Sequence, residues 1–280
     1  MQKTTHAAYW TDGGALKKGE AADFFPFFDG GKHVISLVGG GGKSTLLDYL
    51  AGCFAARGQR AVIMTTTRMA CPEHVCMSME DCRARWREGL YAACGERMEN
   101  GKFRAPEDTL LAQILDEADA VVIEADGAHM LPCKAPAAHE PVILPQSDIV
   151  IGVVGAEALG QTVDGICHRP QYVCALLGCE GDHRLTAQDM AQILLSSMGT
   201  RKDVGERDFY VVINKCDDEK RIGDGREILA ALAQRGQTKA LLTSFAKGIE
   251  SSLKNLETAA KRRRDGTALA RPYLNQELIC

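Results

Sequence analysis

Short apolar runs alternate with longer amphipathic stretches along most of the chain. The apolar runs predict strands that are buried on both faces, at 33–38, 60–64, 119–123, 149–154, 209–213 and 240–242. The stretches between them predict helices at 43–57, 81–94, 106–118 and 186–198. Strands that alternate with helices favour a mostly parallel sheet flanked by helices, arranged in three α/β/α layers.

The same patterns divide the 280 residues into three parts. We expect an N-terminal segment at 1–32, one continuous α/β domain at 33–265 and a C-terminal tail at 266–280. Within the domain, a stretch rich in Pro and Ala predicts a long loop at 128–146. A closing helix is expected at about 250–262.

A glycine-rich loop joins the first of these strands to the first helix. The strict GxxxxGK[ST] pattern fails, because its first glycine would fall on Leu37. A shorter form, GxxGK[ST]T, fits the run Gly39, Gly40, Gly41, Gly42, Lys43, Ser44 and Thr45. Glycines let backbone N–H groups curl around an anion, and the helix N-terminus adds partial positive charge. With Lys43 on the β- and γ-phosphates and Ser44 on Mg²⁺, the loop predicts a P-loop NTPase fold that binds a nucleoside triphosphate.

Two acidic residues, Glu124 and Asp126, follow the strand at 119–123. Because they lie two positions apart, an extended chain places both on one face. We expect Glu124 to orient the metal and Asp126 to position water or contact a partner, which makes Asp126 a catalytic candidate together with Lys43. The alternative is a surface turn that carries two solvated acids.

Three threonines end the strand at 60–64. The hydroxyl of Thr66, the middle one, is a candidate ligand for Mg²⁺ or the γ-phosphate. The β-propensity of threonine explains the same pattern equally well.

The strand at 209–213 is followed by Asn214-Lys215-Cys216-Asp217, which fits the NKxD motif of GTPases. In that motif the Asp accepts hydrogen bonds from guanine N1 and N2, the Asn bonds the base and the Lys packs over its plane. A carboxylate suits guanine because adenine lacks this pair of donors. Ser244 lies in a segment that resembles the loop touching guanine O6. GTP is therefore preferred over ATP as the ligand, with an ordinary polar loop as the alternative.

Composition narrows the class of protein further. The net charge of −4 disfavours general nucleic-acid binding. The basic run at 261–264 is interpreted as a solvated helix end, where the helix dipole favours cations, with an RNA or partner contact as the alternative. The eleven cysteines are scattered and form no CxxC pair, and no apolar run approaches the length of a membrane span. A reduced, cytoplasmic protein without membrane or nucleic-acid partners is expected. Two Cys/His groups lack a standard zinc spacing, namely His129, Cys133 and His139, and Cys71, His74, Cys76 and Cys82.

The order of these segments resembles the selenium-dependent hydroxylase accessory protein family, known as YqeC. The resemblance covers about residues 33–250 and rests on segments 34–45, 65–67, 122–127, 131–136, 139–142, 168–170 and 212–217. Two positions depart from the family pattern: Arg68 stands where a threonine is expected, and Cys133 where an aliphatic residue is expected. The resemblance implies a cytosolic phosphate-loop protein that helps to mature molybdenum-containing hydroxylases, some with a labile selenium. A hydroxylase of this kind, or its cofactor, is the implied partner.

Three functions are compatible with these patterns. The first is a slow, Mg²⁺-dependent maturation NTPase, which is expected to use GTP. The second is an ATP-dependent kinase or ligase for a small molecule, since the short loop also resembles that of the Mur ligases. The third is a binding protein that nucleotide switches without hydrolysis.

Overall fold

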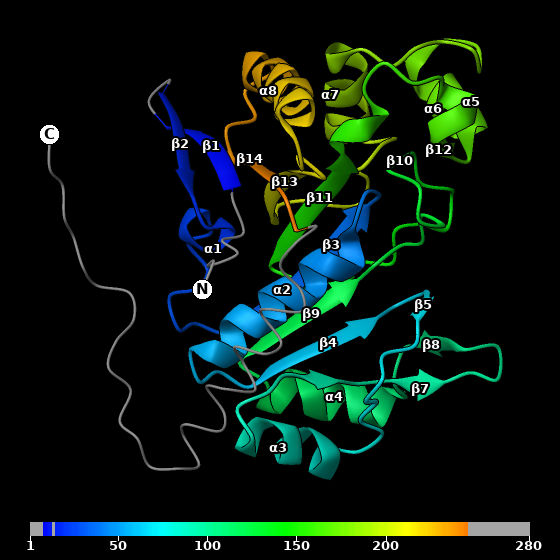
Figure 1. Ribbon diagram of the computed structural model, residues 1–280. Coiled ribbons are helices and arrows are strands. Elements are labelled where there is room, and N and C mark those ends of the chain that lie inside the picture. The colour runs from blue at the N-terminus through cyan, green and yellow to red at the C-terminus, as the bar shows by residue number, and fades with distance from the viewer. Residues whose placement is uncertain (1–7, 13–14, 246–280) are drawn as a thin grey trace, which may run out of the picture.

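A nine-stranded sheet forms the centre of the molecule in the computed structural model, which describes residues 8–12 and 15–245 (Figure 1). From one edge to the other, the strands are β2 (Ala15–Gly19), β1 (Ala8–Asp12), β14 (Ala240–Thr243), β13 (Asp208–Asn214), β11 (Ile149–Gly155), β3 (His33–Gly39), β9 (Ala120–Glu124), β4 (Ala61–Thr65) and β6 (Ala92–Ala93). Neighbours from β14 to β6 are all parallel, whereas β1 is antiparallel to both of its neighbours, β14 and β2. The predicted mostly parallel α/β sheet is confirmed.

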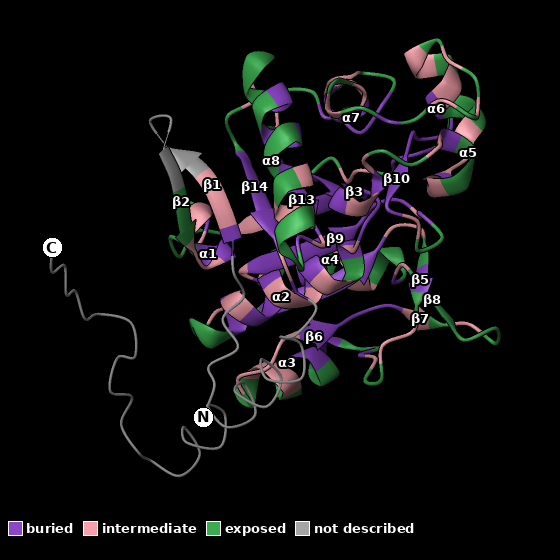
Figure 2. Cartoon of the chain, turned by 45° about the horizontal axis from the view of Figure 1, so that its top comes forward, coloured by how far each residue is buried: buried purple, intermediate pink, exposed green. Residues whose placement is uncertain are grey.

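Helices cover both faces of this sheet. They are α1 (Ala21–Phe24), α2 (Lys43–Ala56), α3 (Met79–Arg87), α4 (Asp108–Glu117), α5 (Val163–Ile166), α6 (Pro170–Leu177), α7 (Ala187–Leu195) and α8 (Glu219–Gln234), with a 3₁₀ turn at Ala156–Ala158. Side chains on one face of the strands, such as Ile35 and Leu37, pack against α1 and α2. Those on the other face pack against α3 and α4 or against α7 and α8. Figure 2 shows the central strands buried and the outer side of α8 exposed, as three layers require.

The predicted helix at 81–94 is wrong in its second half. A capping box between Ser78 and Asp81 begins α3 at Met79, and the helix ends at Arg87. Gly89 follows with φ 74°, a conformation that glycine adopts without steric cost and that stops the helix. The chain then enters the short strand β6, which pairs with β4.

Two small sheets lie outside the central one. One is antiparallel and contains β5 (Arg68–Ala70), β8 (Lys102–Arg104) and β7 (Glu96–Arg97). The other pairs β10 (Cys133–Lys134) in parallel with β12 (Cys167–His168), so the predicted loop at 128–146 contains one short strand. Figure 1 shows β10 and β12 beyond the carboxyl ends of the central strands.

The expected helix at 250–262, the basic run at 261–264 and the tail at 266–280 lie outside the described residues. Within the part of the chain that the structure describes, no helix combines the length and the apolar character needed to cross a membrane.

Candidate phosphate-binding site

The loop between β3 and α2 has a shape that only glycine permits. Gly39, Gly41 and Gly42 have φ values of 98°, 83° and 113°, in the left-handed region. A Cβ atom on Gly40 would lie 2.5 Å from the carbonyl oxygen of Leu131. The loop is therefore held against the backbone behind it, and the four glycines are explained by geometry as well as by motif.

Lys43, the first residue of α2, turns back over this loop. Its side chain is only 3% exposed, and its Nζ atom donates to the Gly39 carbonyl oxygen at 2.6 Å. The same Nζ lies 3.2 Å from Asp126 Oδ1 and 3.8 Å from Glu124 Oε1. A buried ammonium group thus stands between the glycine loop and the two acids that the sequence singled out.

Glu124 ends β9 beside the start of α2. Its Oε2 accepts a hydrogen bond from Ser44 Oγ at 2.9 Å. Burial raises the pKa of Glu124 above its usual value, while Lys43 and the Ser44 hydroxyl oppose that shift. A hydroxyl and a carboxylate at one point are oxygen ligands of the kind that Mg²⁺ takes when phosphates and water complete its shell.

Thr66 and Thr45 lie near this pair without joining it. The Thr66 hydroxyl donates to the carbonyl oxygen of Val142 at 2.7 Å, which fastens the end of β4 to the loop after β10. Thr45 is half-buried in the first turn of α2. Among the described residues, no group of three or more His, Cys, Asp or Glu side chains is arranged to hold a metal ion, and this covers both predicted Cys/His groups.

Asn214 joins the base-side segments to the phosphate loop. It is buried, and its Nδ2 atom donates to the carbonyl oxygen of Gly41 at 2.8 Å. Its Oδ1 atom accepts from the Thr243 hydroxyl at 3.0 Å. The ends of β13 and β14 are in this way tied to the loop after β3.

Asp217 and Ser244 face each other at the same edge of the sheet. Ser244 Oγ donates to Asp217 Oδ1 at 2.6 Å, and Asp217 is exposed. Lys215 has a left-handed backbone with φ 62° and pairs with Glu157. The structure therefore brings the four residues predicted to bind the base to the edge where the phosphate loop lies: Asn214, Lys215, Asp217 and Ser244.

Two charged residues of this region, Lys134 and Glu140, were not candidates in the sequence analysis. Lys134 Nζ lies 3.0 Å from Asp126 Oδ2 and 2.7 Å from Glu140 Oε2. Arg169 Nη1 reaches the same Glu140 oxygen at 2.7 Å. Lys134 and Glu140 are both buried. The ion pairs form a row of alternating charges that leads from Lys43 through Asp126, Lys134 and Glu140 to Arg169. The segment His168-Arg169-Pro170 predicts an arginine near phosphate or substrate, but it gives no indication of these partners.

Asp48 was also missed. It lies one helical turn after Ser44 in α2, and Tyr91 Oη donates to its Oδ1 at 3.1 Å. Burial raises the pKa of Asp48 to about 6, the nearby Glu124 carboxylate adds to that shift, and the bond from Tyr91 opposes it. The acidic side of the site thus holds a third carboxyl group.

A glycine loop between a parallel strand and a helix, a buried lysine and an acid at the end of the adjacent strand define the P-loop NTPase fold. The chain belongs to the YqeC family. It is 32% identical over 193 residues to the protein YqeC of Escherichia coli (strain K12), which covers 61% of this chain and 71% of that protein. The family described as YqeC protein matches residues 35–171.

Two solved structures match most of this chain. The hydrogenase maturation factor HypB from Archaeoglobus fulgidus gives a TM-score of 0.39 at 12% identity, covering 83% of this chain and 92% of that chain. HypB from Helicobacter pylori in complex with nickel gives 0.34 at 10% identity, covering 90% and 97%.

Proposed function

We propose that this protein binds a nucleoside triphosphate with Mg²⁺ in the loop between β3 and α2. The observation that supports this most strongly is the position of Lys43. Its ammonium group is buried over four glycines and stands beside Asp126 and Glu124. A loop of backbone N–H groups at a helix N-terminus, with a lysine above it, is the arrangement that holds phosphate oxygens.

In the proposed complex, Lys43 exchanges the Gly39 carbonyl for oxygens of the β- and γ-phosphates. Ser44 and Glu124 would hold Mg²⁺, which supplies a charge that neutralises the triphosphate. Asp126 is our candidate for positioning the attacking water. Its two oxygens now accept the Gly39 N–H at 3.0 and 3.1 Å, so it stands where the loop and the acids meet.

We infer that the base is guanine. The exposed carboxylate of Asp217 lies beside Ser244, at the edge that also holds Asn214. A carboxylate accepts from two guanine donors and finds no such pair on adenine. The bond from Asn214 to the phosphate loop gives the base end of the site a direct connection to the phosphate end.

The activity we propose is slow hydrolysis that accompanies the maturation of a molybdenum-containing hydroxylase. The family resemblance supports this role, and the cargo is expected to be the hydroxylase or its cofactor. The contacts of Asp126 support slow hydrolysis. Its carboxylate is bound by the Gly39 N–H and by two lysines, so it is less free to activate a water molecule.

Calorimetric titration of GTP and ATP, side by side with Mg²⁺ present, tests the nucleotide assignment. We expect tighter binding of GTP. Asp217→Asn should weaken GTP by about 10–100-fold, because a charged acceptor is lost, and leave ATP within about twofold. Lys43→Ala should weaken both nucleotides by at least about tenfold.

Asp217 is exposed, so its substitution is not expected to disturb folding, and circular dichroism checks this for both variants. ATP binding that equals or exceeds GTP binding would refute the guanine assignment and favour the ATP-dependent kinase or ligase. Unchanged binding in a folded Lys43→Ala variant would refute the phosphate loop itself.

A further inference from the structure

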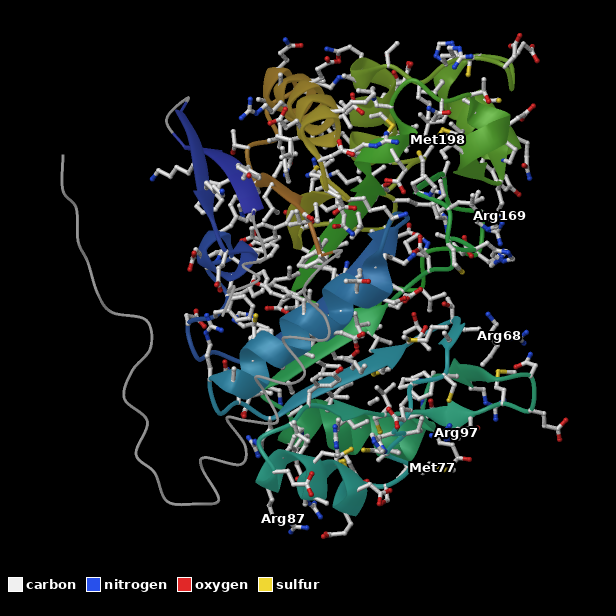
Figure 3. All side chains as sticks on the ribbon, in the orientation of Figure 1. Arg68, Met77, Arg87, Arg97, Arg169 and Met198 are labelled. Atoms are coloured by element: carbon white, nitrogen blue, oxygen red, sulfur yellow. The ribbon has the colours of Figure 1, made fainter. Side chains whose placement is uncertain are left out.

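A cluster of basic side chains lies beside the phosphate site and has no part in the function proposed above. We call it the His–Arg cluster; it consists of His129, His168 and Arg169. The rings of His129 and His168 are stacked, with centroids 4.5 Å apart and planes at 14°. Within the described residues, neither imidazole makes a hydrogen bond through a ring nitrogen. Figure 3 shows Arg169 at the outer edge of the molecule, on the side where Arg68 and Arg97 also lie.

The backbone of the cluster is strained. His129, Met130 and Arg169 have φ values of 49°, 64° and 57°, in the left-handed region that disfavours side chains with a Cβ atom. Met130 is also 96% exposed, so no packing of its side chain explains its conformation. Such strain gathers at ligand sites, where the surrounding structure holds residues in unfavourable conformations. Here the strained residues include His129 and Arg169, and Arg169 directly follows His168.

Two further charged residues, Lys134 and Glu140, lie next to the cluster. Lys134 is buried beneath it, and its charge adds to that of Arg169. The pKa of His168 is lowered, first by burial and then by His129, Lys134 and Arg169, with Glu140 acting the other way. Glu140 is already shared between the lysine and the arginine. Besides burial, these neighbouring basic groups disfavour a positive charge on the His168 ring, and the same groups attract an anion.

From this geometry we infer that the His–Arg cluster binds a phosphate group of a second ligand, distinct from the nucleotide. A phosphate monoester carries close to two negative charges at neutral pH and offers three acceptor oxygens. Arg169 donates to protein through Nη1 only, among the described residues, and its other N–H groups match a phosphate edge. The two imidazoles supply further donors, and a dianion stabilises the protonated form of either one.

The position suits the acceptor or cargo of a nucleotide-driven reaction. Arg169, Glu140, Lys134 and Asp126 are joined by successive ion pairs, and Asp126 contacts Lys43. Two side chains thus separate the cluster from the acid beside the phosphate loop. The inference rests on the proposed function in one respect, because it takes the nucleotide to be the first ligand. Phosphate binding at the His–Arg cluster does not itself require nucleotide binding.

The test is a titration of the full chain with inorganic phosphate, followed by NMR of the histidine rings. The Lys43→Ala variant is used, so that binding at the glycine loop is suppressed. We expect the His129 and His168 signals to shift in a saturable way. The pKa of His168 should rise by about half a pH unit or more, because a bound anion favours the charged ring. His33 and His183, which pair with Asp148 and Asp189, are internal references that should stay unchanged.

Two variants complete the experiment. Arg169→Gln should weaken phosphate about tenfold or more, since a charged donor is lost. His129→Asn keeps a residue type that tolerates the left-handed backbone, and it should weaken phosphate several-fold without unfolding the chain. Histidine signals that ignore phosphate, or respond equally in Arg169→Gln, would overturn the inference. GTP binding by the wild-type protein is measured in parallel. Failure of phosphate binding at the His–Arg cluster can then be distinguished from failure of nucleotide binding at the glycine loop.

Discussion

At the scale of single residues, the phosphate loop depends on close approach as well as on backbone freedom. Gly39, Gly41 and Gly42 need glycine for their positive φ values. Gly40 needs it only because a Cβ would strike the Leu131 carbonyl. The two reasons can be separated experimentally, because Gly40 has a backbone conformation that other residues adopt.

Gly40→Ala is expected to lower the free energy of unfolding by about 1–3 kcal/mol, the usual cost of overpacking. The added methyl must push the loop away from Leu131, so nucleotide affinity should fall as well. Urea unfolding and calorimetry measure the two effects. Gly127→Ala is the matched control, since a Cβ there meets no atom within 4 Å. Equal stability of the two alanine variants would contradict the packing argument.

At the scale of elements, α2 gathers three functional groups on its first two turns. Gly42 precedes the helix with a left-handed backbone, which sets the direction in which Lys43 and Ser44 leave the loop. Asp48 follows one turn after Ser44 and faces Glu124 closely enough for the two charges to interact. The helix therefore brings a cation, a hydroxyl and a carboxyl group close to Glu124.

Asp48→Asn tests the raised pKa of this carboxyl group. An unfolded Asp titrates near ~3.9, whereas Asp48 in the native protein has a pKa of about 6. Between these values the native state binds more protons than the unfolded state, so the free energy of unfolding falls as pH rises. The Asp48→Asn variant has no carboxyl group at this position, so its free energy of unfolding does not fall in this way. It should be more stable than wild type by about 1–3 kcal/mol at pH 8.

Urea unfolding of both proteins between pH 4 and pH 8, without nucleotide, measures the effect. The advantage of Asp48→Asn should shrink towards pH 4, where the native carboxyl is protonated and the unfolded one is about half protonated. Parallel curves across the whole range would show that Asp48 titrates normally. The asparagine keeps an oxygen that can accept from Tyr91, so the packing of α2 is preserved.

Elements with a strong local pattern could be predicted from the sequence. The parallel strands are buried on both faces, so their continuous apolar runs marked β3, β9, β11 and β13 within two residues of their ends. Helix α8 was not predicted, because two glycines and a charged first turn interrupt its apolar stripe. The hairpin of β1 and β2 escaped prediction because its pairing with β14 is a contact between distant parts of the chain.

The candidate site follows the same division. Lys43, Ser44, Glu124 and Asp126 could be predicted because each lies at the end of a strand or the start of a helix, and the topology brings those ends together. The roles of Lys134, Glu140 and Arg169 could not. Their charges are meaningful only through partners that tertiary packing supplies.

At the scale of the whole molecule, that row of alternating charges connects the central sheet to the layer formed by β10, β12 and α6. Lys134 is its middle member and is buried between Asp126 and Glu140. A buried charge that loses its partner is costly, whereas exposed ion pairs contribute little.

Lys134→Met is therefore expected to lower the free energy of unfolding by about 3–5 kcal/mol, because two buried carboxylates lose their shared cation. Lys239→Met is the matched control: Lys239 forms an exposed pair with Asp208, and its loss should cost less than about 1 kcal/mol. Chemical denaturation of both variants provides the comparison. Similar losses in the two would show that the buried pairs do not hold these layers together.

The pairing of β1 with β14 has a consequence for how the chain is made. Ala8 lies opposite Thr243, so a segment pairs with one that the ribosome makes roughly 235 residues later. At ~5–20 residues per second, the N-terminal hairpin waits on the order of ten seconds or more for its partner. Until then its strand edge is unprotected, and the base-side end of the sheet is unformed. Because an open strand edge can pair with other chains, we expect this hairpin to be prone to aggregation during synthesis until β14 has been made.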